Sequence, residues 1–397
     1  IIAQTYIKFY MNMRNPSLKN KFIYKCVNIR ASRKVCRKGS QQVKKTKIVK
    51  QFILAALLLA TLISCNNTGG KRIEDNLFAL DTYISFVVST GKDQDSRAGL
   101  DSAIKRIQDI EKRMSVTLPD SDISKVNKAA GKEPVKVHSD TFYVIQKAIQ
   151  YGELTQGSFD ISIRPVGELW DISGDNPRVP YKTEIEQLLP LVDYRKIKLD
   201  EQEQTVFLEQ EGMSIDLGGI AKGYAGDEVV RILKEHGVSH ALVNLGGNIA
   251  VINGKEDGSP WRIGIQNPRL DDDSERRGHV AAITTTGNSI VTSGDYERYM
   301  VEVYKQTGKR YHHIFDPETG RPTQNSVISV TIVTESGIDA DALSTALFVM
   351  GVEKGLKLAN ELEGIEAMII DEGKTIYLSE GLKDQISAIH SDYNAVD

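Results

Sequence analysis

Three segments in the second half of the chain carry residue types that can act on a phosphate ester. They are a glycine-rich run at residues 216–223, the neighbouring His312 and His313, and Asp341 followed four residues later by Thr345. Backbone N–H groups at glycines can approach an anion, an imidazole can move a proton near neutral pH, and hard oxygens suit a divalent cation. Together they predict chemistry at a pyrophosphate.

The glycine-rich run lies where a predicted strand is followed by a predicted helix. Glycines at such a helix start leave backbone N–H groups open to an anion. The run matches neither the P-loop nor the dinucleotide-binding pattern, and a tight turn that needs positive φ would also explain its glycines. Lys222 favours a bound anion, because a cation in the first helical turn opposes the helix dipole.

Asp341 and Thr345 lie on a predicted helix, where a spacing of four residues places their oxygens on one face. They could therefore ligate one hard cation, and a single negative charge suits Mg²⁺ that also binds substrate phosphates. The alternative is that Asp339 or Asp341 only caps this helix.

His312 and His313 would point to opposite faces if they lie in a strand, so only one can reach a cleft. A single histidine in a strand usually has a structural role. Farther upstream, the segment Ser158-Phe159-Asp160 lies close in sequence to Trp170. These aromatic side chains could cover a planar ligand, although packing in the core explains them equally well.

The elements that must position these residues follow from periodicity and turn residues. Helices are expected where apolar residues recur every three or four positions, and strands where they alternate. The expected helices are at residues 100–114, 139–149, 183–189, 221–235, 340–350 and 353–362. The expected strands are at residues 77–88, 196–199, 205–209, 214–217, 241–252, 289–291, 300–304 and 326–333, and near Met368 and Tyr377. The strand at residues 241–252 is expected to be broken by Gly246-Gly247. Strands and helices mix without strict alternation, which predicts an α+β fold with largely antiparallel sheets flanked by helices.

The N-terminal part of the chain predicts export. Residues 1–73 contain no Asp or Glu, and the apolar run at residues 51–63 is shorter than the roughly 20 residues of a membrane-spanning helix. The run ends in Leu62-Ile63-Ser64-Cys65, which resembles a bacterial lipobox with Cys65 as the lipid-modified residue. The alternative is an ordinary buried helix with a chance cysteine.

We therefore expect four parts along the chain. Residues 1–42 would not belong to the mature protein, residues 43–64 would be a lipoprotein signal peptide, residues 65–72 a tether, and residues 73–397 the folded domain. The protein would be exported and anchored by Cys65 to a bacterial membrane on its periplasmic side. The part from Cys65 onward carries 36 basic and 53 acidic residues, a net charge of about −17, which argues against a nucleic acid partner.

Several segments, in this order, resemble the ApbE family of flavin transferases. The similarity spans about Leu77 to the C-terminus, and it includes Met114-Ser115 and Phe159-Asp160. Four motifs carry it: residues 216–225, 292–296, 312–317 and 340–345. Several matched motifs in a fixed order are far more specific than any one of them.

The resemblance implies an FAD:protein FMN transferase that needs Mg²⁺ and binds FAD in a cleft between two lobes. FAD would be cleaved at its pyrophosphate, AMP would leave, and FMN would be joined to a Ser or Thr hydroxyl of an exported acceptor protein. Asp341, Thr345 and the Gly219 carbonyl would be the metal ligands, and His313, with an ordinary pKa, the base. The implied FAD contacts are Leu80, Thr117, Ser158, Phe159, Asp160, Asp216, Lys222 and Ile314.

The chain departs from the family pattern at three positions. Thr117 stands where many members have a tyrosine, Ser344 where some have a second aspartate, and Leu80-Asp81-Thr82 where the family has Met-Gly-Thr. Two other functions would use the same residues: a Mg²⁺-dependent FAD pyrophosphatase, in which water replaces the acceptor hydroxyl, and a non-catalytic FAD-binding lipoprotein.

Overall fold

A computed structural model describes residues 72–89, 96–269 and 278–396. They all belong to one compact unit, Thr68–Asp397. The predicted signal peptide and Cys65 lie outside the described residues, and the first strand begins at Arg72, the last residue of the predicted tether. Among the described residues, no helix is both long and apolar enough to cross a bilayer.

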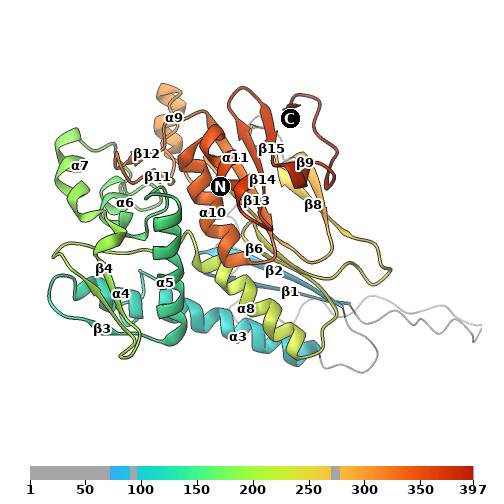
Figure 1. The fold of residues 1–397 in the computed structure, drawn as a ribbon, viewed down its shortest axis with the longest axis horizontal. Helices are drawn as coiled ribbons and strands as arrows, with labels where there is room; N and C mark the ends of the chain where they lie inside the picture. The colour runs from blue at the N-terminus through green and yellow to red at the C-terminus, as the bar shows by residue number, and fades with distance from the viewer. Residues whose placement is uncertain (1–71, 90–95, 270–277, 397) are drawn as a thin grey trace, which may run out of the picture. The chain divides into compact units, whose positions relative to one another are not determined.

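The described part of the unit is built on a nine-stranded sheet (Figure 1). In spatial order its strands are β1 (Arg72–Ala79), β2 (Thr82–Ser89), β6 (His240–Leu245), β7 (Asn248–Ile252), β10 (Ser289–Gly294), β13 (Val327–Thr334), β14 (Glu366–Asp371), β15 (Thr375–Leu378) and β17 (Asn394–Val396). The pairing is antiparallel except between β15 and β17. All eight residues of β13 are buried, as expected for a central strand covered on both faces.

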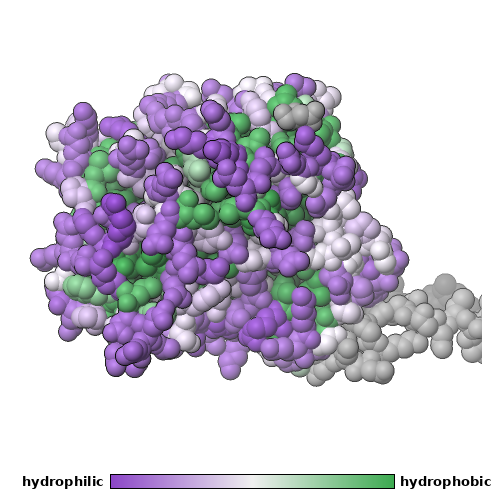
Figure 2. Space-filling model, viewed as in Figure 1, coloured by the Kyte–Doolittle hydropathy of each residue, from purple (hydrophilic) through white to green (hydrophobic). Residues whose placement is uncertain are grey.

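Helices cover one face of this sheet. They are α3 (Ser96–Met114), α8 (Ala221–Glu235), α10 (Gly337–Met350) and α11 (Val352–Glu361). Their apolar residues and those of the strands form the largest core cluster, in which Phe86, Ile107 and Phe348 are almost fully buried. Figure 2 shows hydrophilic residues on the solvent side of this layer and hydrophobic residues between them. The fold is therefore α+β, as predicted.

A small sheet covers the other face. It contains β8 (Trp261–Gln266), β9 (His279–Thr285) and β16 (Ile386–Ser387). A second apolar cluster lies between the two sheets and includes Ile283, Ile290 and Ile370. The active-site residues predicted on α8 and α10 therefore lie on the helix side of the central sheet.

A separate lobe is inserted between β2 and β6 (Figure 1, left). Its helices are α4 (Asp122–Lys128), α5 (Ser139–Leu154), α6 (Arg164–Trp170) and α7 (Lys182–Leu188). Its small sheet has the strand order β3 (Val135–Lys136), β5 (Thr205–Leu208) and β4 (Ile197–Asp200). The lobe also contains the short 3₁₀ helices η2 (Ile161–Ile163), η3 (Leu189–Leu191) and η4 (Tyr194–Lys196). A last segment holds α9 (Val301–Thr307), β11 (Phe315–Asp316) and β12 (Arg321–Pro322), and η5 (Glu380–Leu382) follows β15. Trp170 of the lobe donates its Nε1–H to the Gly320 carbonyl at 3.0 Å, which joins α6 to this segment.

Three expectations about strands were wrong. Residues 77–88 form two strands, because Leu80 and Asp81 make a two-residue turn with φ of 52° and 56°; such turns favour Asn and Gly, so this sequence gives no turn signal. Residues 214–217 are not a strand, and residues 301–304 open helix α9. The expected break at Gly246-Gly247 is confirmed, and it makes residues 241–252 a hairpin of two strands. The strands β8 and β9 were not predicted.

Three helices are joined by a partly buried arginine on α3. Arg106 donates to Asp140 of α5 at 2.8 Å, to Glu228 of α8 at 2.7 Å and to the Tyr224 hydroxyl of α8 at 2.9 Å. Its side chain is 16% exposed. Asp140 also accepts from Arg113 at 2.7 Å. The network fixes α8, which begins at the glycine-rich run, against the inserted lobe.

Replacing Arg106 by alanine is expected to lower the free energy of unfolding by about 2–4 kcal/mol, because the two carboxylates keep their desolvation cost and lose a shared partner. Urea denaturation of both proteins measures this. Arg97→Ala is the control on the same helix, since Arg97 makes exposed ion pairs and its loss should leave the unfolding midpoint unchanged. Equal midpoints for all three proteins would contradict the role of the network.

Candidate active site

The start of α8 carries Lys222 close to Asp341. Asp216 Oδ1 accepts from the Gly218 N–H at 2.7 Å and shapes the turn before the helix. Lys222 Nζ donates to the Gly218 carbonyl at 2.8 Å and lies 3.7 Å from Asp341 Oδ1. The lysine therefore has partners in the protein itself, and it adds a positive charge beside the predicted metal ligands.

Two glycines bring α8 and α10 into backbone contact. A Cβ added to Gly223 would overlap the Gly337 carbonyl oxygen, so no larger residue fits there. At the same point the Gly223 N–H donates to Asp341 Oδ2 at 2.9 Å. Asp227 of α8 accepts from the N–H groups of Gly337 at 2.6 Å and Ile338 at 2.9 Å. These contacts fix the position of Asp341 relative to the glycine-rich turn.

The predicted metal ligands lie together. Asp341 is 3% exposed, and a Cβ added to Gly219 would lie 3.5 Å from Thr345 Oγ1. The helix is capped by Ser336, not by Asp341, and Asp339 is paired with Lys147 at 3.2 Å. The capping alternative for Asp341 is therefore wrong. The Asp341 carboxylate, the Thr345 hydroxyl and the backbone carbonyl of Gly219 are all hard oxygens, the kind of ligand that Mg²⁺ prefers.

The site supplies a single carboxylate. In residues 72–89, 96–269 and 278–396 no group of three or more His, Cys, Asp or Glu side chains could hold a metal. The hydroxyl of Ser344 donates to the Asp341 carbonyl at 2.9 Å and lies 2.8 Å from Ser293 Oγ. A cation held by so little charge would depend on substrate phosphates for its remaining ligands.

The two histidines lie in different environments, although His312 forms only an isolated bridge with Tyr299 and His313 lies in a bend rather than in a strand. His312 is buried, packs against the Phe348 ring at 5.4 Å, and its Nε2 lies 3.2 Å from the Thr323 carbonyl oxygen. His313 is half-buried, and both its backbone N and its ring Nδ1 lie within 3.2 Å of the Arg298 carbonyl oxygen. A carbonyl only accepts, so Nδ1 of His313 carries the proton and Nε2 has the free lone pair.

The environment of His313 keeps its ring neutral. Burial, together with the nearby charge of Arg298, lowers the pKa of His313 to about 3. The expectation of an ordinary histidine pKa was therefore wrong, because the sequence does not reveal how deeply a side chain is desolvated. A neutral ring with a free Nε2 can accept a proton at neutral and at mildly acidic pH.

This pKa sets a pH dependence. The pKa of His313 in the folded protein lies below the unfolded value of about 6.5, so its ring stays neutral in the free enzyme well below pH 6.5. The neutral ring contributes to the stability of the folded protein above about pH 6.5. This contribution is lost as the pH falls toward about 3. We expect the titration of His313 to change kcat/KM by less than about twofold between about pH 7.5 and about pH 5.

A pH–rate profile of the wild type and of Asp227→Asn tests this expectation. Burial raises the pKa of Asp227 to about 6, so an acid limb near this pH that disappears in the variant belongs to Asp227. An acid limb near 6.5 that persists in the variant would contradict the low pKa of His313.

Of the predicted flavin contacts, Phe159 lies against the glycine-rich turn. A Cβ added to Gly219 would be 3.3 Å from its ring. Asp160 is buried, and its carboxylate accepts from Ser162 N–H at 2.8 Å and Tyr194 N–H at 2.9 Å. This carboxylate therefore holds the segment that carries Ser158 and Phe159 in place.

The remaining predicted contacts lie on three other segments. Leu80 is in the β1–β2 turn, where its N–H donates to Glu111 Oε1 at 2.7 Å. Thr117 is exposed in the loop after α3 and its hydroxyl lies 2.9 Å from Ser115 Oγ. Ile314 is buried next to His313. The structure does not show contact between these three and the glycine-rich turn, so their role stays a prediction.

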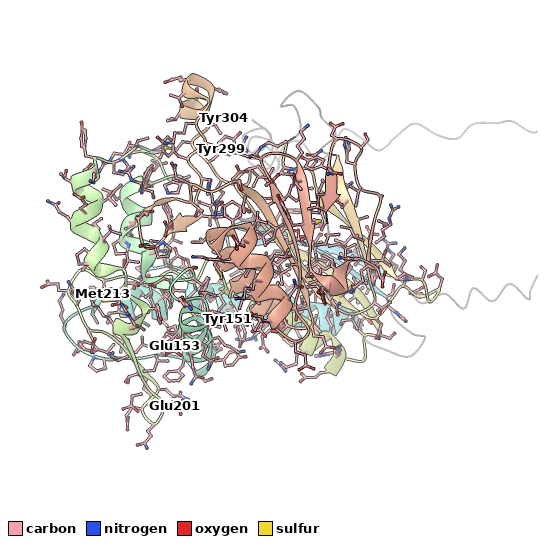
Figure 3. All side chains as sticks on the ribbon, turned by 45° about the horizontal axis from the view of Figure 1, so that its top comes forward. Tyr151, Glu153, Glu201, Met213, Tyr299 and Tyr304 are labelled. Carbon is pink, nitrogen blue, oxygen red and sulfur yellow. The ribbon has the colours of Figure 1, made fainter. Side chains whose placement is uncertain are left out.

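A stacked arginine anchors the segment before the histidines. The Arg310 guanidinium lies 4.7 Å from the ring centres of both Tyr299 and Tyr304, which lie side by side at α9 (Figure 3). Arg310 also pairs with Asp295 at 3.2 Å. Sequence reasoning missed this cluster and Arg298, although both border the quoted motifs at residues 292–296 and 312–317.

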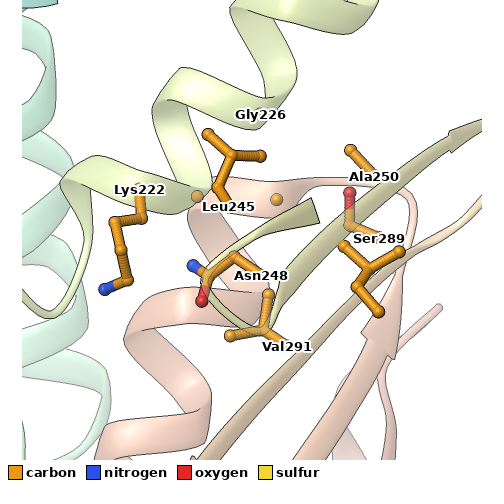
Figure 4. Close-up of a pocket in the computed structure, with 10 residues that line it drawn as sticks. Lys222, Gly226, Leu245, Asn248, Ala250, Ser289 and Val291 are labelled. Carbon is orange, nitrogen blue, oxygen red and sulfur yellow. The ribbon is translucent and has the colours of Figure 1, made fainter. Parts of the chain in front are cut away.

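A small cavity borders the start of α8, and a larger one lies beside the central sheet. One of about 10 Å³ lies between α8 and β7, and Figure 4 shows Lys222 extending away from it. It has room for no more than about one water molecule. The other, of about 370 Å³, lies beside β6, β7, β8 and β10 and is bordered by Thr82 and Glu297. Neither is lined by Asp341, Thr345 or His313.

Comparison with known proteins identifies the family. The sequence model of the ApbE family matches residues 80–369. An FAD:protein FMN transferase from Klebsiella pneumoniae (strain 342) is 36% identical over 294 residues, which cover 74% of this chain and 88% of the relative. A protein of the same name from Treponema pallidum (strain Nichols) is 33% identical over 305 residues, which cover 74% and 82%.

Solved structures agree with this match. The ApbE protein of Thermotoga maritima superposes with a TM-score of 0.72 at 36% identity, over 79% of this chain and 99% of that one. The flavin transferase ApbE of Vibrio cholerae superposes with a TM-score of 0.71 at 29% identity, over 80% and 99%. Sequence motifs, fold and relatives therefore all show that the chain belongs to the ApbE family.

Proposed function

We propose that this protein transfers FMN from FAD to a Ser or Thr hydroxyl of an exported acceptor protein and releases AMP. The observation that carries the proposal is the arrangement of Asp341, Thr345 and Lys222 at the glycine-rich turn, in a chain that is 36% identical to a protein named FAD:protein FMN transferase. This arrangement supports the proposal, because hard oxygens and a positive charge beside a glycine-rich turn can bind a pyrophosphate.

The reaction is a single displacement at phosphorus. The acceptor hydroxyl oxygen attacks the phosphorus of the FMN half, and its proton passes to Nε2 of His313. The bond between this phosphorus and the bridging oxygen breaks, and AMP leaves with the electron pair. Lys222 stabilises the negative charge that develops on the leaving phosphate.

Asp341, Thr345 and the Gly219 carbonyl would hold Mg²⁺. When bound, the cation would neutralise the charge of the pyrophosphate as a Lewis acid. The chain's own contribution is to fix these ligands, which it does through the Gly223–Asp341 hydrogen bond and the close packing of α8 on α10.

We expect the flavin and adenine of FAD to lie between the inserted lobe and the central sheet. Phe159 would stack or pack against one of the rings, and Asp160 would support it from behind. Leu80, Thr117, Ser158, Asp216 and Ile314 are the further contacts that we propose for FAD. Thr117 cannot stack as a tyrosine would, so we expect the ring to depend more on Phe159.

We propose that the protein works outside the cytoplasm, held on a bacterial membrane by lipid chains on Cys65. The basic flank, the short apolar run and the residues before Cys65 support this. Cell fractionation tests it: the wild type should sediment with membranes, and Cys65→Ser should be released or remain an unprocessed precursor. A soluble, unlipidated wild type would contradict the anchor.

Peptide mapping of a flavin-accepting domain tests the transfer. The purified chain is incubated with FAD, Mg²⁺ and the domain. The domain is then digested, and the masses of its peptides are measured by mass spectrometry. We expect one peptide to gain FMN less water on a Ser or Thr, and a domain with alanine at this position to stay unmodified. Flavin attached elsewhere, or none attached, would contradict the proposal.

A further inference from the structure

A chain of contacts connects the β1–β2 turn to His313 through one arginine. Arg298 Nη1 lies 3.1 Å from Asp81 Oδ2, and Nη2 donates to the Asp81 carbonyl at 3.2 Å. The carbonyl of the same Arg298 accepts from the His313 backbone N–H at 3.1 Å and from its ring Nδ1–H at 3.2 Å. Arg298 thus contacts the turn with its side chain and the histidine with its backbone.

We propose that Arg298 is a positioning residue for His313, and that Asp81 acts through it. The ion pair with Asp81 holds the Arg298 carbonyl at the place where it keeps the His313 ring in the Nδ1–H tautomer. This inference rests on the proposed function, in which Nε2 of His313 takes the proton of the acceptor hydroxyl.

The tautomer matters because only one of the two neutral forms can act as the base at Nε2. If the proton moved to Nε2, the lone pair of Nδ1 would face the carbonyl oxygen of Arg298, and Nε2 could no longer accept. The carbonyl therefore selects the reactive form, in the way that a second hydrogen-bond partner selects the tautomer of other functional histidines.

Stability does not explain the ion pair. The side chains of Arg298 and Asp81 are 45% and 78% exposed, and exposed pairs stabilise a fold by only about 0–1 kcal/mol. The turn that carries Asp81 is itself unfavourable, since Leu80 and Asp81 have φ of 52° and 56° without being glycines. Two contacts nevertheless stabilise this turn: the hydrogen bond from the Leu80 N–H to Glu111 and the ion pair between Asp81 and Arg298.

The β1–β2 turn also connects His313 to the part of the site where we expect FAD, the FMN donor, to bind. Leu80, next to Asp81, is a proposed FAD contact. Its N–H donates to Glu111 of helix α3. Asp81 and Arg298 are 217 positions apart in sequence. The Asp81–Arg298 pair thus couples the segment expected to touch FAD to the residue expected to receive the proton.

Three variants of the full chain test the proposal: Asp81→Asn, Arg298→Gln and the double variant. The His313 ring is observed by ¹⁵N NMR of histidine-labelled protein without substrate, with its signals assigned by their loss in His313→Gln. FMN transfer is measured in parallel. Glu302→Gln is the matched control, because the Glu302–Lys305 pair on α9 is also an exposed ion pair, at 78% and 62%.

We expect the wild type and Glu302→Gln to show the Nδ1–H tautomer alone. Each single variant should show a mixture of tautomers and a kcat lower by about 10–100-fold, with the KM for FAD changed less. The double variant should be no slower than the slower single variant, because the two residues act as one unit.

Two results would overturn the proposal: an unchanged tautomer in the variants, whatever their kcat, or losses in kcat that add up in the double variant. If the wild type transfers no FMN at all, the proposed function fails. The NMR spectra still test the link between Asp81, Arg298 and His313 in this case, because they need neither FAD nor an acceptor.

Discussion

Asp341→Asn is expected to reduce FMN transfer by about 10³-fold, because a Mg²⁺ ion contributes several kcal/mol to the stabilisation of charge in a phosphoryl transfer. Asp341 supplies the only carboxylate among the proposed metal ligands and is buried beside Lys222. The variant keeps the shape of the side chain and can still accept from the Gly223 N–H. Turnover as a function of Mg²⁺ concentration measures the loss.

Asp339→Asn is the control for this prediction. Asp339 lies two residues away on α10 and pairs with Lys147 rather than with the site. It should keep the Mg²⁺ dependence of the wild type. Full activity of Asp341→Asn at ordinary Mg²⁺ concentrations would refute the metal assignment. Thermal unfolding of each variant separates a lost ligand from a lost fold.

His313→Gln is expected to lower kcat for FMN transfer by about 10²–10⁴-fold while FAD still binds, since a general base contributes that much. Its Nε2 receives no hydrogen bond from a described residue, and its ring is neutral at working pH. Flavin fluorescence measures FAD binding, and single-turnover AMP release measures the chemistry. An equal loss of binding and rate would make His313 a binding residue instead.

His312→Gln is the companion variant. His312 is buried against Phe348 and bonds the Thr323 carbonyl, so the change should lower the unfolding temperature more than it lowers kcat of the folded fraction. If His312→Gln instead lost transfer in a stable protein, the assignment of the two histidines would be reversed.

The sequence predicts well what depends on neighbours along the chain. The helices α8 and α10 start within three residues of the expected positions. The proximity of Asp341 and Thr345 follows from their spacing on one helix. The antiparallel class follows from the mixture of short strands and helices.

Other features depend on contacts between distant segments, which periodicity does not reveal. Gly223 and Asp341 are 118 positions apart, and no local pattern pairs them. The Leu80-Asp81 turn lacks the glycine that usually marks a hairpin. The low pKa of His313 arises from burial and from Arg298, which lies on a different segment. Each is a property of the folded chain.

The most direct test follows AMP and flavinylated acceptor in the same reaction over time, with the purified chain, FAD, Mg²⁺ and a flavin-accepting domain. The account predicts one AMP released for each FMN attached, at rates that fall together in His313→Gln. AMP with free FMN and an unmodified acceptor would show a pyrophosphatase, and bound FAD with neither product would show a carrier; either result would contradict transfer.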